Sequence, residues 1–140
     1  EAVKSLIDQS KINVEVVFRG CGNEVEVGEQ VNRLGLANVV KLRPTISYDE
    51  AIKEMLQSDV LALFQGSPFN RQIPAKVYEY IRANRPILAM TDVNGETAKF
   101  LRKWDGIYVS DPVSQGCIEK ILVKLFDDVI RKNNFDRKKK

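Results

Sequence analysis

The sequence contains no histidine among its 140 residues and has two cysteines, Cys21 and Cys117. Without histidine, Ser-His and Cys-His nucleophile pairs and histidine-based metal sites are excluded within this chain. The cysteines lie far apart and lack Cys-x-x-Cys spacing, so the sequence predicts no zinc site, no other bound metal and no disulfide framework. We expect a reducing, cytoplasmic setting and a chemistry based on carboxylates, lysines, arginines, backbone amides or a partner domain.

The sequence also lacks an apolar run approaching the roughly 20 residues that a membrane-spanning helix needs. Its N-terminus, EAVKSLIDQS, does not have the shape of a signal peptide. The net charge is +3, but the run RKKK at 137–140 exceeds that, so the rest of the chain is close to neutral and predicts no nucleic-acid binding. We interpret 132–140 as a basic, disordered tail; the alternative is a peripheral contact with anionic lipid at the inner face of a membrane.

Length and composition predict one domain over residues 1–131, because 140 residues, 44% of them apolar, suffice for one core. Short runs rich in β-branched residues alternate with helical patterns, which predicts strands at 12–18, 38–42, 60–64, 86–90 and 106–109. Strands this apolar, each flanked by helices, indicate a parallel sheet covered on both faces. We therefore predict an α/β fold with a Rossmann-like, doubly wound parallel sheet in three α/β/α layers.

Helix boundaries are also marked in the sequence. Apolar residues recur with helical spacing over 27–34, and Gly35 is placed to end that helix in a left-handed conformation. Ser47 stands three positions before Glu50, the spacing of a capping box. A long amphipathic helix is predicted over 118–129. The chain opens on another helical segment, EAVKSLIDQ, with no strand before it in the sequence.

In open parallel sheets, ligands bind beyond the carboxyl ends of the strands, so the loops that leave the strands are the candidate site. The loop FRGCGNE, at 18–24, follows the first predicted strand. Its Gly20 and Gly22 permit a sharp turn close to a ligand, and Arg19 could meet a phosphate. The alternative is a plain connection, because the third glycine of a GxGxxG pattern and a P-loop lysine are missing.

The loop LRPTISYDE, at 42–50, follows the second predicted strand. Pro44 stiffens its exit from the sheet, and Arg43 could face the ligand crevice. The alternative is again a structural connection with an exposed arginine.

The third loop belongs to the stretch FQGSPFNRQIPAKVYEY, at 64–80, where Pro74 fits the first turn of a helix. Amides at the start of a helix attract anions, so a diphosphate is the expected guest. Val77 and Ile81 define the inner face of that helix, and at about 100° per residue Glu79 projects almost opposite them. The stretch predicts a phosphate-binding helix start with a carboxylate one turn further in; the alternative is a solvated glutamate.

The segment IPAKVYEYIRANRPILA resembles the P-[S/A]-K-[hydrophobic]-[Y/F]-E-Y … G-x-P-[I/V]-[hydrophobic]-A segment of the retaining glycosyltransferases of GT-B fold called group 1 or family 4. VEVVFRGCG is similar to their second strand and glycine turn, and VVKLRPTISYDEAIKEMLQSDVLALF to the unit that follows. The first of these segments is distinctive, whereas the rest is generic α/β sequence. The resemblance implies the C-terminal, donor-binding domain of such an enzyme, which holds a nucleoside-diphosphate sugar without a cofactor or a tightly bound metal.

The resemblance also implies roles for individual residues. Glu79 would hydrogen-bond the ribose hydroxyls, and the amides around Ala75 and Lys76 would hold the diphosphate. The RGCG and LRPT loops would line the base end. Arg71 stands where the family commonly has a glutamate that contacts the donor sugar, which leaves the sugar open. The implied reaction transfers a sugar, with retention, to a glycan or lipid-linked acceptor in surface polysaccharide synthesis; no catalytic residue is assigned.

In that family a first strand, with an arginine and a lysine that clamp the diphosphate, would precede Glu1. This strand is central in a sheet of order 3-2-1-4-5-6, so we expect a gap between the strands at 12–18 and 60–64. The sheet could close by another pairing, take a strand from a partner, as in a dimer, or remain a domain of limited stability. Because the acceptor-binding N-terminal half would also be missing, we expect that this chain alone does not turn over.

Two other classes of function stay open at this point. A sugar-nucleotide epimerase half, or another nucleotide-binding domain, would share the fold but would need catalytic acids that the sequence does not reveal. A non-catalytic interaction domain would bind no nucleotide and would use exposed Phe69, Tyr78 or Trp104 for a protein contact.

Overall fold

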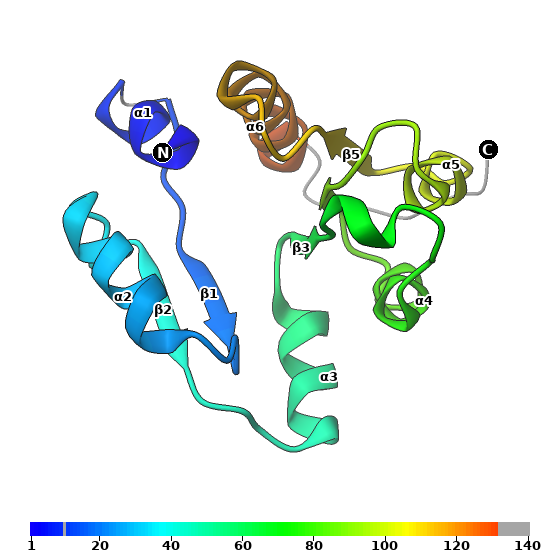
Figure 1. Ribbon diagram of the computed structural model, residues 1–140, viewed down its shortest axis with the longest axis horizontal. Coiled ribbons are helices and arrows are strands. Elements are labelled where there is room, and N and C mark those ends of the chain that lie inside the picture. Colours follow the sequence, from blue (N-terminus) through cyan, green and yellow to red (C-terminus); the bar gives the residue numbers. More distant parts are fainter. Residues whose placement is uncertain (10, 132–140) are drawn as a thin grey trace. The chain divides into compact units, whose positions relative to one another are not determined.

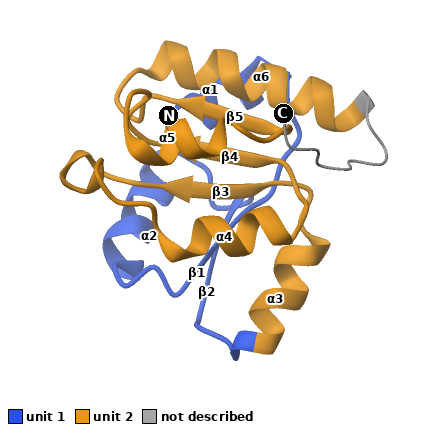
Figure 2. Ribbon diagram, turned by 90° about the vertical axis from the view of Figure 1, so that its right-hand side faces the viewer, with its two compact units in different colours: residues 1–48 blue, residues 49–140 orange. Residues whose placement is uncertain are grey.

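The computed structural model describes residues 1–9 and 11–131, so the tail predicted over 132–140 lies outside the described residues. The chain divides into two compact units, residues 1–48 and 49–140 (Figure 2). Each unit is an α/β structure with parallel strands.

The first unit holds two helices and a two-stranded parallel sheet (Figure 1): α1 (Ala2–Asp8), β1 (Val16–Arg19), α2 (Glu24–Arg33) and β2 (Val40–Arg43). Val16 lies opposite Val40, and Arg19 lies opposite Arg43. Gly35, just after α2, has a φ of 67°, which confirms the predicted left-handed end of that helix. The strand predicted from residue 12 begins instead at Val16, because β2 offers a partner to four residues.

The second unit is built around the sheet β3-β4-β5, in which all neighbours are parallel. Helices connect successive strands, as the alternation in the sequence predicts. Its elements are α3 (Tyr48–Gln57), β3 (Leu61–Phe64), the short 3-10 helix η1 (Ser67–Phe69), α4 (Ala75–Arg82), β4 (Ile87–Met90), α5 (Glu96–Leu101), β5 (Ile107–Ser110) and α6 (Gln115–Arg131).

The core of the second unit lies between its sheet and the helices α4 and α5. Ile87 of β4, Val77 of α4 and Leu101 of α5 are completely buried there, together with other apolar side chains, Leu61, Leu63, Tyr80, Ala83 and Ala89. Successive side chains of a strand point to opposite faces of a sheet. Every residue of β4 is buried, so this central strand is covered on both faces.

Helix α6 covers the other face of the same sheet, so the second unit has three α/β/α layers (Figure 1). Its Leu122 and Leu125 are buried, and its Asp128 accepts a hydrogen bond of 2.7 Å from the hydroxyl of Tyr108 on β5. The 17 residues of α6 contain the amphipathic segment that the sequence predicts. In the described part of the chain, no helix has the length and apolar character needed to cross a membrane.

The two sheets remain separate. Among the described residues, β1 pairs with β2 alone and β3 pairs with β4 alone, so no strand continues either sheet at the edge formed by β1 or by β3. The chain therefore has a Rossmann-like α/β fold that lacks its first strand, as predicted from the sequence.

The Tyr108–Asp128 contact makes the second unit sensitive to alkaline pH. Burial, then the hydrogen bond from the hydroxyl to Asp128 and the charge of that carboxylate, raises the pKa of Tyr108 well above its ordinary value of 10.0. Unfolded chains therefore lose this proton first, and the stabilisation is fully present below about pH 10 and falls as the pH rises further. We expect Tyr108→Phe to lower the free energy of unfolding by about 1 kcal/mol near neutral pH.

As the pH rises from about 8 to about 11, the free energy of unfolding should fall less for Tyr108→Phe than for the wild type. Urea denaturation at several pH values measures this difference. Burial, and then the charge of Glu79, also raises the pKa of Tyr80, so some alkaline loss should persist in the variant. If the free energy of unfolding falls equally with pH in the two proteins, Tyr108 is not the cause of the alkaline loss of stability.

The turn after β1 depends on a glycine. Gly20 has a φ of 56°, and a Cβ at this position would collide with the side-chain methyl of Thr45. Gly22, with a φ of 81°, has no described atom within 4 Å of such a Cβ. We expect Gly22→Ala to cost about 1–2 kcal/mol through backbone strain, and Gly20→Ala to cost about 1 kcal/mol more through the clash.

Thermal denaturation of both variants measures this difference. Thr45→Ser removes the methyl, so it should return the Gly20→Ala variant to the level of Gly22→Ala. Equal losses for the two glycine variants, with no rescue by serine, would exclude the clash.

Candidate functional site

Helix α4 begins directly after a ten-residue loop that leaves β3. Pro74 precedes its first helical residue, and no side chain caps this end. The proline thus lies one position before the predicted place, but its φ of −60° still directs the chain into the helix. The amide of Val77 donates to the Pro74 carbonyl, whereas within the described residues the amides of Ala75 and Lys76 donate to no acceptor. Two open amides at the positive end of a helix suit an anion.

Glu79 lies one turn further along α4, and its side chain is partly exposed. Val77 is completely buried and Ile81 is partly buried, which confirms the predicted inner face of this helix. Tyr80 is also buried on this face, which the sequence analysis did not predict. Its hydroxyl donates to the carbonyl of Ala62 on β3 over 3.3 Å.

The chain leaves α4 through a left-handed residue. Asn84, two positions after the last residue of the helix, adopts a φ of 55°. Asparagine is the residue that replaces glycine most readily in this conformation. The helix therefore ends in a conformation that asparagine tolerates, and Pro86 leads into β4 as predicted.

A buried amide organises the loop between β3 and α4. Gln65 continues the inward-facing positions of β3, and its side chain is 6% exposed. Its Nε2 donates to the carbonyls of Phe69 and Gln72, over 2.8 Å and 2.9 Å. Its Oε1 accepts from the Thr91 hydroxyl over 2.9 Å, and the Thr97 hydroxyl also donates to the Gln72 carbonyl over 2.9 Å. Each end of the buried amide therefore has a partner, as burial of a polar group requires.

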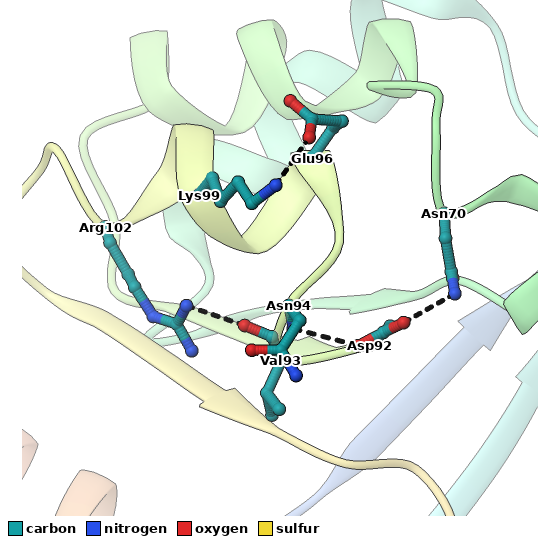
Figure 3. Close-up of polar contacts among 7 residues, drawn as sticks. All are labelled: Asn70, Asp92, Val93, Asn94, Glu96, Lys99 and Arg102. Carbon is teal, nitrogen blue, oxygen red and sulfur yellow. Dashed lines mark hydrogen bonds and ion pairs between the residues drawn. The ribbon is translucent and has the colours of Figure 1, made fainter.

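The same loop is attached to the start of α5 (Figure 3). Asn70 Nδ2 donates to Asp92 Oδ2 over 2.6 Å, and the amide of Glu96 donates to the Asn70 carbonyl over 2.9 Å. The other carboxylate oxygen of Asp92 accepts from the amide of Asn94 over 2.8 Å. The loops that leave the neighbouring strands β3 and β4 are thus joined at the carboxyl edge of the sheet.

Two basic side chains, Lys99 and Arg102, contact the segment at the start of α5 (Figure 3). Arg102 Nη1 donates to the Val93 carbonyl over 2.6 Å. Lys99 Nζ lies 2.8 Å from Glu96 Oε1, and this hydrogen bond with its charge lowers the pKa of the Glu96 carboxyl. Both contacts lie within the segment 92–102, to which Asn70 is hydrogen-bonded.

The Asn70–Asp92 contact should be sensitive to charge. Asn70→Asp would place a second carboxylate against Asp92, which raises the pKa of one of the two. We expect the variant to lose about 1–3 kcal/mol of unfolding free energy relative to the wild type at neutral pH, and less at about pH 4, where one carboxyl is protonated. Urea denaturation at both pH values measures this difference.

Asp92→Asn serves as the control, because it keeps the side-chain size and adds no charge. A loss for Asn70→Asp that is the same at both pH values would contradict the electrostatic explanation. It would point to packing of the loop, in which Asn70 Oδ1 is buried and accepts no hydrogen bond from the described residues.

In the first unit, the loops after β1 and β2 are fastened to one another. The amide of Gly20 donates to the Arg43 carbonyl, and Arg19 Nη1 donates to the Pro44 carbonyl, both over 2.9 Å. Arg43 Nη2 lies 3.9 Å from Glu15 Oε1, with both side chains about half exposed. The positive φ of Gly20 and of Gly22 confirms the sharp turn predicted there. The roles of these residues toward a phosphate or a base stay predictions.

The predicted site residues thus form two groups. Arg71, Ala75, Lys76 and Glu79 belong to the β3–α4 segment of the second unit, and Arg71 is exposed there. The remaining five lie at the carboxyl ends of β1 and β2 in the first unit: Arg19, Gly20, Gly22, Arg43 and Pro44.

Sequence reasoning missed Gln65, Thr91 and Thr97 as organisers of this segment. The signal was present, because a polar residue directly follows each of two apolar strands. The register pairs Phe64 with Met90, so Gln65 and Thr91 occupy the next pair of positions.

The aromatic residues proposed for a protein contact differ in exposure. Phe69 and Tyr78 are exposed, at 55% and 50%, as the interaction-domain hypothesis requires. Trp104 was expected to be exposed and is instead partly buried. The chain turns back after α5, where the Trp104 amide donates to the carbonyl of the buried Leu101, and the indole nitrogen is buried.

Within residues 1–9 and 11–131, no cluster of three or more Cys, Asp or Glu side chains could hold a metal ion. Neither the family models nor the curated proteins with which the sequence was compared match it.

Proposed function

We propose that this chain is the donor-binding domain of a retaining glycosyltransferase of GT-B fold and that the β3–α4 segment binds a nucleoside-diphosphate sugar. The observation that carries the proposal is the start of α4. The open amides of Ala75 and Lys76 offer a diphosphate site, and Glu79 places a carboxylate one turn further on. This combination of an anion site and a hydroxyl acceptor on one short helix suits a nucleoside diphosphate.

In this proposal the two ends of the ligand are bound by different chemistry. The diphosphate accepts hydrogen bonds from the first amides of α4, while the ribose hydroxyls donate to Glu79. Arg71, which is exposed in the loop before α4, contacts the donor sugar.

The reaction transfers the sugar to a glycan or lipid-linked acceptor with retention of configuration. The departing diphosphate is stabilised by backbone amides and cations, which is an electrostatic task that needs no histidine. An N-terminal acceptor-binding domain is the required partner, so the chain by itself binds donor without turnover.

One observation favours a second function, that of a non-catalytic interaction domain. Phe69 and Tyr78 are exposed, and the Tyr78 ring lies 5.4 Å from the ring of Phe100. An aromatic surface of this kind suits a protein contact. This function predicts that no nucleoside diphosphate binds.

Isothermal titration of the chain with UDP, GDP and ADP tests the proposal. We expect one of them to bind with a dissociation constant between about 1 μM and about 1 mM, which corresponds to roughly −8 to −4 kcal/mol. Inorganic pyrophosphate should bind more weakly, because it lacks the ribose. A chain shown to be folded by circular dichroism that binds none of the three would favour the interaction domain.

A further inference from the structure

We propose that Gln65, Thr91 and Thr97 are positioning residues that fix the loop 66–74 and, through it, the amides at the start of α4. The consequence for nucleotide binding rests on the proposed function, whereas the control of the loop conformation does not. None of these three side chains is among those proposed to contact the ligand.

The hydrogen bonds of Gln65 and Thr97 are directed at the loop. Both donors of the Gln65 amide reach backbone carbonyls of the loop, at Phe69 and at Gln72. The Thr97 hydroxyl donates to that same Gln72 carbonyl, two residues before Pro74. The side chains therefore attach the loop to β3, where Gln65 follows the last strand residue, and to α5.

All three side chains are also buried. Thr91 and Thr97 are completely buried and Gln65 is nearly so, in a region where the sheet face is otherwise apolar. Removing one partner of a buried hydrogen bond leaves the other unsatisfied, at a cost that an apolar residue at this place would avoid. The bonds of Gln65 and Thr97 end on carbonyls of the loop, and the bond of Thr91 ends on the Gln65 side chain. Together they therefore stabilise one conformation of the loop.

The same loop has a second, independent attachment. The Asn70 carbonyl accepts from the amide of Glu96, and a Cβ on Gly95 would lie 3.3 Å from that carbonyl and 3.2 Å from the Asp92 carbonyl. The loop is thus held closely against the start of α5. A loop ordered before the ligand arrives loses less conformational freedom on binding, which strengthens binding without adding a contact.

Matched substitutions test the proposal in the full chain. Thr91→Val and Thr97→Val remove a hydroxyl at nearly constant shape, whereas Thr91→Ser and Thr97→Ser keep the hydroxyl. Gln65→Met removes both donors of the amide. Amide hydrogen exchange resolved by residue compares the hydrogen-bonded loop amides of Phe69, Asn70 and Gln72 with those of β4. Titration with UDP, GDP and ADP follows binding.

We expect the valine and methionine variants to exchange the hydrogen-bonded loop amides of Phe69, Asn70 and Gln72 about tenfold faster while β4 keeps its protection. The nucleoside diphosphate that binds the wild type should bind these variants about tenfold more weakly. Both serine variants should resemble the wild type. Exchange that rises equally in the loop and in β4 would overturn the proposal, because the three residues would then stabilise the unit without positioning the loop.

Failure of the proposed function would look different. If the wild type binds none of the three nucleotides, the donor-binding proposal is wrong, and the exchange comparison still decides whether these residues position the loop.

Discussion

Replacing Ile87 by alanine is expected to lower the free energy of unfolding by about 2–5 kcal/mol. Ile87 is completely buried in the central strand β4, and it belongs to the cluster that joins the sheet to α4 and α5. Alanine would leave a cavity that neighbours on a regular strand cannot close. A loss of this size is a large fraction of the stability of an ordinary domain, and urea denaturation measures it.

The chain offers a matched control for this substitution. Ile130 lies on α6 and is 75% exposed. Ile130→Ala should change the stability by no more than about 0.5 kcal/mol, since it removes little buried surface. Similar losses for the two variants would contradict the assignment of the core.

Replacing Glu79 by glutamine is expected to weaken binding of the nucleoside diphosphate at least about tenfold. The amide keeps the shape of the carboxylate but loses its charge, so two charge-assisted hydrogen bonds to the ribose hydroxyls become ordinary ones. Because Glu79 is partly exposed, the fold should tolerate the change. Isothermal titration of wild type and variant measures the difference.

Glu29→Gln is the control for the change in net charge, because Glu29 is an exposed residue of α2 in the other unit. It should bind the nucleotide as the wild type does. Equal weakening in both variants would mean that the overall charge of the chain, and no direct contact by Glu79, governs affinity.

Much of the fold could be predicted because hydrophobic periodicity reports local structure. Each of the five strands was located to within one residue at its carboxyl end, which is where the candidate loops begin. The start of β1 was misplaced, since residues 12–15 carry a strand-like pattern without a ladder partner. Pairing depends on the neighbouring strand, which periodicity in one segment does not reveal.

The candidate site was only partly predictable. The helix with Glu79 was found because proline, the apolar positions and the following Arg85-Pro86 mark its limits within a few residues. The Gln65 network was not found, because its hydrogen bonds join residues that are up to 26 positions apart. The exposure of Trp104 was wrong for a similar reason, since a chain reversal after α5 decides it.

The most direct test of the central claim, that Glu79 binds the ribose, compares a ribonucleotide with its 2′-deoxy analogue. Wild type and Glu79→Gln are each titrated with whichever of UDP, GDP and ADP binds best and with the corresponding 2′-deoxynucleoside diphosphate. We predict that the wild type prefers the ribonucleotide by about tenfold and that this preference largely disappears in Glu79→Gln, because the hydroxyl and the carboxylate act as a pair. The same preference in both proteins would contradict the claim.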